Sequence, residues 1–205
     1  MRLASRLGAS WLLLVVLLAL LTLALVGCNS RGVAVPRAPE RAARLDDDSD
    51  HYSVYDLDGR WRDQSGATRA LANWRGAPVL LAMVYTHCTA TCPLAVSELK
   101  RIAALEPGAR FVLVSLDPQR DDATRLAEYA AERSLDSSRW TLLTGSDADV
   151  RDLAATLGVR YRHVTLEDLA HSNLITLLDR EGRIVRQSSG RLDDAALAEL
   201  HAIAR

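Results

Sequence analysis

The sequence has no cluster of basic residues, no internal repeat and few cysteines. Its 205 residues carry a formal net charge of −1, and removal of Arg2 and Arg6 with a leader segment would make the mature chain about −3. Without a basic patch, a nucleic acid is not an expected partner. Three cysteines allow no more than one disulfide within the chain. The length that remains behind the N-terminal segments favours one domain of average size.

Residues 1–27 have the composition of a lipoprotein-type signal peptide. Arg2 and Arg6 supply a positively charged start, and residues 11–26 form an almost continuous apolar run. The run ends at Leu25-Val26-Gly27-Cys28, which resembles the bacterial lipobox, where the chain is cut before the cysteine and the cysteine is acylated. The alternative is an uncleaved signal anchor, because the run is slightly shorter than the roughly 20 residues that span a bilayer.

Both alternatives predict that the rest of the chain is anchored to the membrane and faces the periplasm or the cell exterior. Residues 28–51 then hold the lipid attachment cysteine and a flexible tether, because they contain Pro36, Pro39 and the acidic run Asp46-Asp47-Asp48-Ser49-Asp50 but few large apolar side chains. A flexible chain of this length spans roughly 25 Å between its ends. Residues 52–205 are expected to form the folded domain, within reach of a membrane-bound partner.

The domain alternates between apolar strand patterns and helical patterns. Ala77–Tyr85 is a continuous apolar stretch, as expected for a strand buried on both faces, and Pro93 suits the first turn of a helix. Further strands are expected at Phe111–Leu116, Trp140–Leu143, Leu174–Leu178 and Ile184–Gln187, and further helices at Asp121–Arg133, Asp147–Leu157 and Asp193–Ile203.

An additional strand pair is expected at the start of the domain. Tyr52–Leu57 and Arg60–Trp61 flank Asp58-Gly59, which reads as the turn of a short β-hairpin, and Asp63–Gly66 reads as a second turn. Strand–helix repeats followed by a hairpin and a helix predict a mixed sheet covered on both sides. The fold class is therefore α/β, with the element order of a thioredoxin-like domain and an added N-terminal β-hairpin.

Cys88 and Cys92 are the cysteines left for chemistry if Cys28 is acylated. They lie where the buried strand gives way to a helix, with three residues between them. A C-x-x-C spacing would indicate thiol–disulfide exchange. With one helical turn between them, the Cα atoms are about 6 Å apart, so the pair can form a disulfide or bind one soft metal ion such as Cu(I) or Zn(II). Outside the cytoplasm such a pair must be held reduced by a partner or used as a redox couple.

A metal site would need a third ligand from elsewhere in the chain. His171 is the leading candidate, because it precedes the strand Leu174–Leu178, whose start faces the cysteine loop in a thioredoxin-like sheet. His163 is the main alternative. His87 is the second alternative, although neighbouring residues at a strand end point to opposite sides and His87 would then face away from the ion that Cys88 binds.

The segment Tyr85-Thr86-His87-Cys88-Thr89-Ala90-Thr91-Cys92-Pro93 resembles the signature of the Sco/SenC family, copper-handling proteins of cytochrome oxidase assembly. Four more segments resemble that family in the expected order, from about Tyr52 to the C-terminus. They are Asp63-Gln64-Ser65-Gly66, Ser115-Leu116-Asp117-Pro118-Gln119-Arg120-Asp121, Arg139-Trp140-Thr141-Leu142-Leu143-Thr144-Gly145, and His171-Ser172 with the hairpin that follows it. Ala170 departs from the pattern, since many relatives have an acidic residue there.

The resemblance implies that Cys88, Cys92 and His171 bind copper, as Cu(I) or Cu(II), and that Asp117 lies near the site and orients His171 or a partner. It implies a copper metallochaperone that takes copper from a donor protein and delivers it to a cytochrome oxidase subunit or to the assembly factors of the oxidase. The alternative is a thiol–disulfide oxidoreductase that keeps the oxidase's own copper-site cysteines reduced, and a sensor of copper or oxygen status is a variant of the same chemistry.

A peroxiredoxin-like peroxidase would share the fold but is disfavoured. A peroxidatic cysteine normally follows a Pro-x-x-x-Thr-x-x-Cys pattern, and here Leu81 and Tyr85 stand at the proline and threonine positions ahead of Cys88.

Overall fold

The computed structural model describes residues 52–88, 91–165 and 168–205. These residues belong to one compact unit, Leu45–Arg205. The predicted signal peptide, the lipidation of Cys28 and the tether lie outside the described residues. Within the described part of the chain, no helix combines the length and the apolar composition that crossing a membrane requires.

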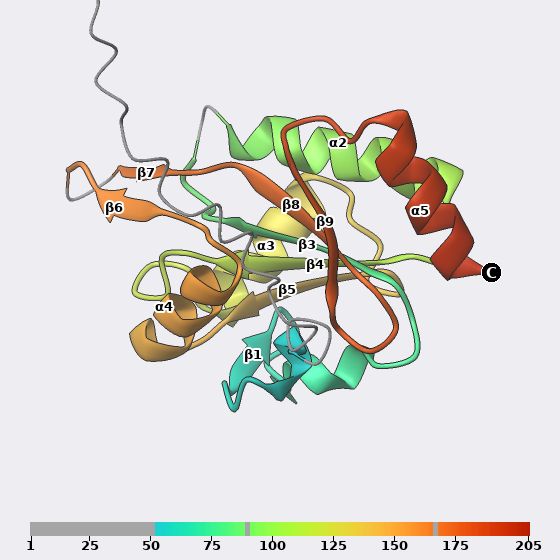
Figure 1. The fold of residues 1–205 in the computed structure, drawn as a ribbon. Helices are drawn as coiled ribbons and strands as arrows, with labels where there is room; N and C mark the ends of the chain where they lie inside the picture. Colours follow the sequence, from blue (N-terminus) through green and yellow to red (C-terminus); the bar gives the residue numbers. More distant parts are fainter. Residues whose placement is uncertain (1–51, 89–90, 166–167) are drawn as a thin grey trace, which may run out of the picture. The chain divides into compact units, whose positions relative to one another are not determined.

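A seven-stranded mixed sheet forms the centre of the domain (Figure 1). Strand β3 (Val79–Val84) pairs in parallel with β4 (Arg110–Ser115) and antiparallel with β8 (Leu174–Leu178). The strand order is β2-β1-β5-β4-β3-β8-β9. The other strands of this sheet are β1 (Trp61–Asp63), β2 (Thr68–Arg69), β5 (Trp140–Thr144) and β9 (Ile184–Ser189). All six side chains of β3 are buried, as its continuous apolar sequence predicts for a strand covered on both faces.

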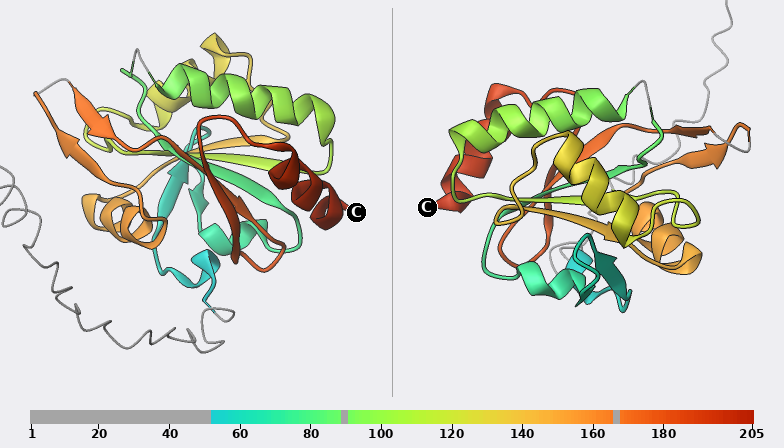
Figure 2. Two further views of the ribbon diagram at one scale, coloured as in Figure 1. Left: turned by 45° about the horizontal axis from the view of Figure 1, so that its top comes forward. Right: turned by 180° about the vertical axis from the view of Figure 1, so that it is seen from behind.

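Helices cover both faces of this sheet. Helix α2 (Cys92–Leu105) and helix α5 (Asp194–Ala204) lie side by side on one face, and α4 (Asp147–Thr156) covers the other (Figures 1 and 2). Helix α3 (Ala123–Glu132) packs against β5 and β1. The predicted α/β class is thereby confirmed: a mixed sheet lies between helices, with the strand that precedes the cysteines near its centre.

The first segment of the domain differs from its prediction. Tyr52–Leu57 was expected as a strand but contains the 3₁₀ helix η2 (Val54–Asp56). The Ser53 hydroxyl accepts the N–H of Tyr55 at 3.1 Å, and the backbone N–H of Asp56 donates back to the Ser53 carbonyl. A serine that caps the backbone in this way turns the chain before a strand can form.

The N-terminal β-hairpin is present, but its turn lies at Asp63–Gly66 and not at Asp58-Gly59. Strands β1 and β2 pair across that later turn. The Asp63 carboxylate accepts the N–H groups of Ser65 and Ala67 at 2.8 and 3.0 Å, which is the local bonding that aspartate offers in turns. A second 3₁₀ helix, η3 (Leu71–Trp74), then leads into β3.

A second sheet was missed by the sequence prediction. Strands β6 (Tyr161–His163) and β7 (Leu169–His171) form a two-stranded antiparallel sheet that projects beyond the main sheet (Figure 1). Both strands are three residues long and carry few apolar side chains, so they show no period-two pattern. This hairpin positions the candidate histidine, because His171 is its last residue and pairs with Tyr161.

Candidate metal centre

The two cysteines lie at the junction between β3 and α2. After β3 ends, a turn closes with the N–H of Cys88 donating to the Tyr85 carbonyl at 3.2 Å. Cys92 is the first residue of α2, and Pro93 occupies the position where a missing N–H costs nothing. Cys88 is 5% exposed and Cys92 is fully buried. The two cysteines are not joined by a disulfide.

The two sulfurs have different surroundings. The backbone N–H of Cys92 donates to the Cys88 sulfur at 3.3 Å, and an N–H at the start of a helix favours negative charge on the atom that it faces. Burial raises the pKa of the Cys92 thiol well above its usual range, and the neighbouring Cys88 raises it further. Cys92 therefore keeps its proton in the metal-free, reduced protein, and a thiophilic ion must displace that proton to bind.

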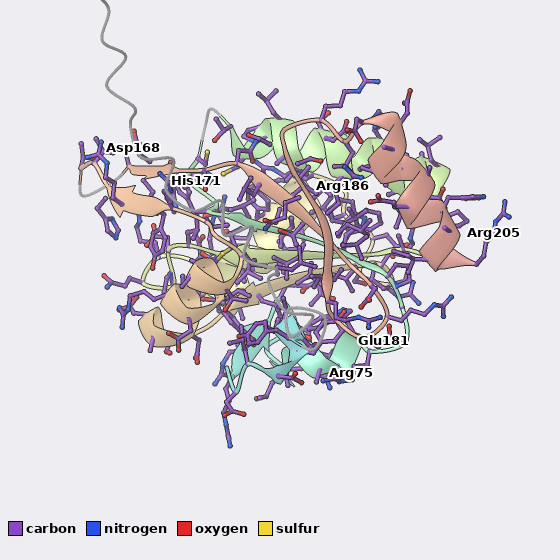
Figure 3. The ribbon with its side chains drawn as sticks, viewed as in Figure 1. Arg75, Asp168, His171, Glu181, Arg186 and Arg205 are labelled. Atoms are coloured by element: carbon purple, nitrogen blue, oxygen red, sulfur yellow. The ribbon has the colours of Figure 1, made fainter. Side chains whose placement is uncertain are left out.

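His171 reaches the cysteines from the β6–β7 hairpin, where Figure 3 shows it at the end of the hairpin nearest the main body. Its Nε2 is 3.3 Å from the Cys92 sulfur and 3.4 Å from the Thr91 hydroxyl. Its Nδ1 is 3.1 Å from the Ser172 carbonyl oxygen. Because a carbonyl can only accept, Nδ1 carries the proton and the Nε2 lone pair faces the sulfurs. This is the arrangement that orients a metal-binding histidine.

Cys88, Cys92 and His171 form a cluster whose ligand atoms all lie within 4.8 Å of one another, and it is the one such group found among the described residues. Three donors spread evenly around one ion, with bonds of about 2.3 Å, are about 4 Å apart. Small shifts of the side chains therefore bring all three into bonding range. Two thiolates and one imidazole are a donor set that suits Cu(I) and Zn(II).

The two alternative histidines do not join this cluster. His87 is exposed, and its Nδ1 lies 3.2 Å from the Thr86 hydroxyl and 3.9 Å from the Asp121 carboxylate. His163 is exposed on β6. Of the three histidines considered from the sequence, His171 is the one that the structure brings to the cysteines.

Tyr85 connects the cysteine segment to the hairpin, a role that the sequence did not predict. Its hydroxyl donates to the Asp168 carboxylate at 3.0 Å and to the Leu169 carbonyl at 3.2 Å. Its ring meets the His171 ring edge-on, with centroids 5.7 Å apart and planes at 77°. Burial raises the pKa of Tyr85 well above its usual range, and the Asp168 carboxylate raises it further, so the hydroxyl stays protonated and donates.

Asp121 supports the turn that carries Cys88 and was also missed. Its carboxylate is fully buried and accepts three hydrogen bonds, from the Thr86 N–H at 3.0 Å, the Thr86 hydroxyl at 2.6 Å and the Ser115 hydroxyl at 2.6 Å. The signal that could have found it is the Asp-Pro-x-x-Asp loop, in which Asp121 is the second aspartate.

Asp117, the first aspartate of that loop, was expected to orient His171 or a partner. It is buried, and its carboxylate pairs with the Arg120 guanidinium. The hydrogen bonds and ring contact described for His171 run to Cys92, Thr91, Ser172 and Tyr85. An orienting role for Asp117 stays a prediction.

A hollow of about 340 Å³ lies beside the cluster, at His171. Residues of the β6–β7 hairpin line it, and His171 is the member of the cluster that it exposes. Of the three cluster residues, His171 is thus the one that borders this hollow, whereas both cysteines are buried.

Comparison with known proteins gives a consistent assignment. The SCO1/SenC family model matches residues 50–204. The human mitochondrial SCO2 homolog is 30% identical over 131 residues, which cover 58% of this chain and 48% of that protein. The chain thus spans about half the length of this mitochondrial relative.

Solved structures also share the fold. Bradyrhizobium japonicum ScoI, in a structure with copper bound, is 27% identical with a TM-score of 0.59, over 71% of this chain and 96% of that chain. BsSco, described as a member of the Sco family of cytochrome c oxidase assembly proteins and as having a disulfide switch, is 21% identical with a TM-score of 0.62, over 71% of this chain and 90% of that chain.

Proposed function

Because the chain belongs to the SCO1/SenC family, we propose that it is a copper metallochaperone for the assembly of a respiratory cytochrome oxidase. It takes copper from a donor protein and passes it to an oxidase subunit or to the assembly factors of the oxidase. Cys88, Cys92 and His171 hold the cargo. The observation that carries the proposal is the convergence of these three donors, two of them separated by 79 positions in the sequence.

The relatives support copper as the cargo. ScoI of Bradyrhizobium japonicum has copper bound in its structure, and BsSco is described as belonging to a family of cytochrome c oxidase assembly proteins. In this chain two sulfurs and one imidazole nitrogen are the soft and intermediate donors that Cu(I) prefers. The family membership and the donor chemistry thus agree on the ion.

The residues of the site suggest how copper would be passed on. His171 is half-buried and borders the hollow, whereas both cysteines are buried. A ligand of the partner can replace the imidazole first and the thiolates afterwards, so that the ion is never without donors. Oxidation of Cys88 and Cys92 forms one S–S bond, releases two protons and passes two electrons to an oxidant, which removes two donors and stops binding.

The test is Cu(I) binding by the reduced full-length chain, in competition with a chelator of known affinity. We expect tight one-to-one binding. Loss of a residue that only hydrogen-bonds a metal ligand typically lowers metal affinity roughly 10- to 100-fold. His171→Ala removes a ligand itself, so it should lower the Cu(I) affinity by at least that factor. His163→Ala, an exposed histidine on the same hairpin, is the matched control and should bind as the wild type does. Weak binding that is indifferent to His171 would refute the proposal.

A thiol–disulfide oxidoreductase that keeps the oxidase's copper-site cysteines reduced is the second candidate. It is favoured by the Cys92 N–H at the Cys88 sulfur, which supports a thiolate nucleophile next to a second free thiol. Turnover of a disulfide substrate by the reduced chain measures this activity. It should survive His171→Ala, because exchange needs only the two thiols.

Membrane tethering through Cys28 completes the proposal, with the domain held at the periplasmic or outer face of the membrane by residues 28–51. It is supported by the apolar run and the lipobox-like Leu25–Cys28. Metabolic labelling with palmitate should mark the wild-type chain and fail to mark Cys28→Ser. Equal labelling of both would reject this anchor.

A further inference from the structure

The β6–β7 hairpin holds one of the three donors, yet it is not part of the main sheet. Its two strands pair only with each other among the described strands. The position of His171 relative to the sulfurs therefore depends on how the hairpin is attached to the segment that carries the cysteines. Among the described residues, Tyr85 and His171 contribute side-chain hydrogen bonds to that link.

Tyr85 contacts both ends of β7. Its hydroxyl donates to Asp168, which directly precedes the strand, and to the carbonyl of Leu169, the first residue of the strand. Its ring meets the imidazole of His171, the last residue. Tyr85 is 3% exposed and lies three residues before Cys88. One rigid side chain thus spans the short strand that positions the imidazole and belongs to the turn that positions a sulfur.

We propose that Tyr85 is a positioning residue for His171: its hydroxyl holds β7 against the cysteine turn and thereby limits the rate at which copper leaves the site. The proposal rests on the proposed function, because copper is taken as the cargo. When the imidazole leaves the ion, a fixed hairpin returns it to the same place. A loosened hairpin lets an incoming ligand replace it before it returns.

The contacts separate this role from general support of the fold. Phenylalanine would keep the buried ring and its edge contact with His171, and would remove only the hydroxyl. Asp168 is exposed, so its carboxylate would be hydrated without that partner and would not be left buried and unpaired. The loss should therefore fall on the attachment of β7 and not on the core.

The first measurement is amide hydrogen exchange in the reduced, metal-free full-length chain. In Tyr85→Phe the amides of residues 169–171 should exchange roughly tenfold faster, as expected when one hydrogen bond to a charged group is lost. Tyr161→Phe is the matched control. Tyr161 lies on the same hairpin opposite His171, and no hydrogen bond of its hydroxyl occurs among the described contacts. Equal exchange in the wild type and Tyr85→Phe would overturn the proposal.

The second measurement is the transfer of Cu(I) to excess bathocuproine disulfonate after rapid mixing. Release should be roughly tenfold faster from Tyr85→Phe than from the wild type or Tyr161→Phe. Unchanged release, or release from Tyr161→Phe that is as fast as release from Tyr85→Phe, would refute the positioning role.

Failure of the proposed function would look different. Wild-type Cu(I) binding that does not depend on His171 would overturn the part of the proposal that concerns release. Hydrogen exchange needs no copper and would still decide whether Tyr85 holds β7.

Discussion

At the scale of single residues, the buried carboxylate of Asp121 holds the turn that carries Cys88, although Asp121 is distant in sequence from both cysteines. It has no exposed surface, and three donors from Thr86 and Ser115 surround it. The Arg125 guanidinium also donates to the Thr86 hydroxyl at 3.1 Å. The turn before Cys88 is therefore fixed by a network rooted in β4 and α3.

Asp121→Ala should lower the free energy of unfolding by about 3 kcal/mol or more. It would leave a buried N–H and two hydroxyls without an acceptor, each at about 1–3 kcal/mol before local rearrangement. Urea denaturation of the reduced full-length chain measures the change. Asp152→Ala, an exposed position on α4, serves as the control and should stay within about 0.5 kcal/mol of wild type. Equal stability of the two variants would show that the network is dispensable.

The candidate site could be predicted in part at this scale. Cys88 and Cys92 follow from their spacing at the end of an apolar stretch, and His171 follows from the family resemblance. Tyr85 and Asp121 could not be predicted in their roles, because a tyrosine at a strand end and an aspartate after a proline are compatible with many partners. Only the folded chain shows which donors and acceptors face them.

At the scale of elements, the turn between β1 and β2 is organised by one carboxylate. Asp63 is 3% exposed, accepts backbone N–H groups from Ser65 and Ala67, and pairs with the Arg69 guanidinium at 2.7 Å. Burial acts to raise the pKa of Asp63, but the hydrogen bonds from Ser65, Arg69 and Ala67 together outweigh it, and the pKa lies below its usual value.

This lowered pKa gives the hairpin an acid-sensitive contribution to stability. The folded state favours the ionised carboxylate, so the contribution is complete above the unfolded pKa of about 3.9 and is lost as the pH falls through the lower folded pKa. The difference in unfolding free energy between wild type and Asp63→Asn should therefore be largest near neutral pH and shrink below about pH 4. Urea denaturation at a series of pH values measures it, and a difference that does not depend on pH would contradict the assignment.

The elements that the sequence predicted correctly are those with strong patterns. Residues 79–84 are apolar throughout and form the fully buried β3, and Asp193 caps α5 as expected for a helix that starts there. The elements that it missed depend on few residues. The 3₁₀ helix η2 follows from one serine hydroxyl, and β6 and β7 are too short and too polar to show a period. The pairing of β6 with β7 depends on tertiary contacts, which a local sequence pattern does not reveal.

At the scale of the whole molecule, the site joins the sheet, a helix terminus and a separate hairpin. Cys88 follows β3, Cys92 begins α2 and His171 ends β7. The three donors come together only in the folded chain. An ion bound by all three therefore stabilises the folded state and not the unfolded state.

Cu(I) should therefore raise the melting temperature of the reduced full-length chain. A free concentration about 1,000 times the dissociation constant stabilises by about 4 kcal/mol. For a domain of about 150 residues this corresponds to roughly 10 °C. Differential scanning calorimetry measures the shift. The oxidised chain, in which the disulfide has removed two donors, should show none; the same shift in both redox forms would mean that copper binds elsewhere.

The separation of Cys92 and His171 by 79 positions also determines the order in which the donors of the site are synthesised. A chain made at about 5–20 residues per second exposes its thiols roughly 4–16 s before the imidazole exists. During that interval the nascent chain carries both thiols but lacks the third donor, His171. The first loading with cargo through all three donors therefore has to follow the synthesis of the β6–β7 hairpin.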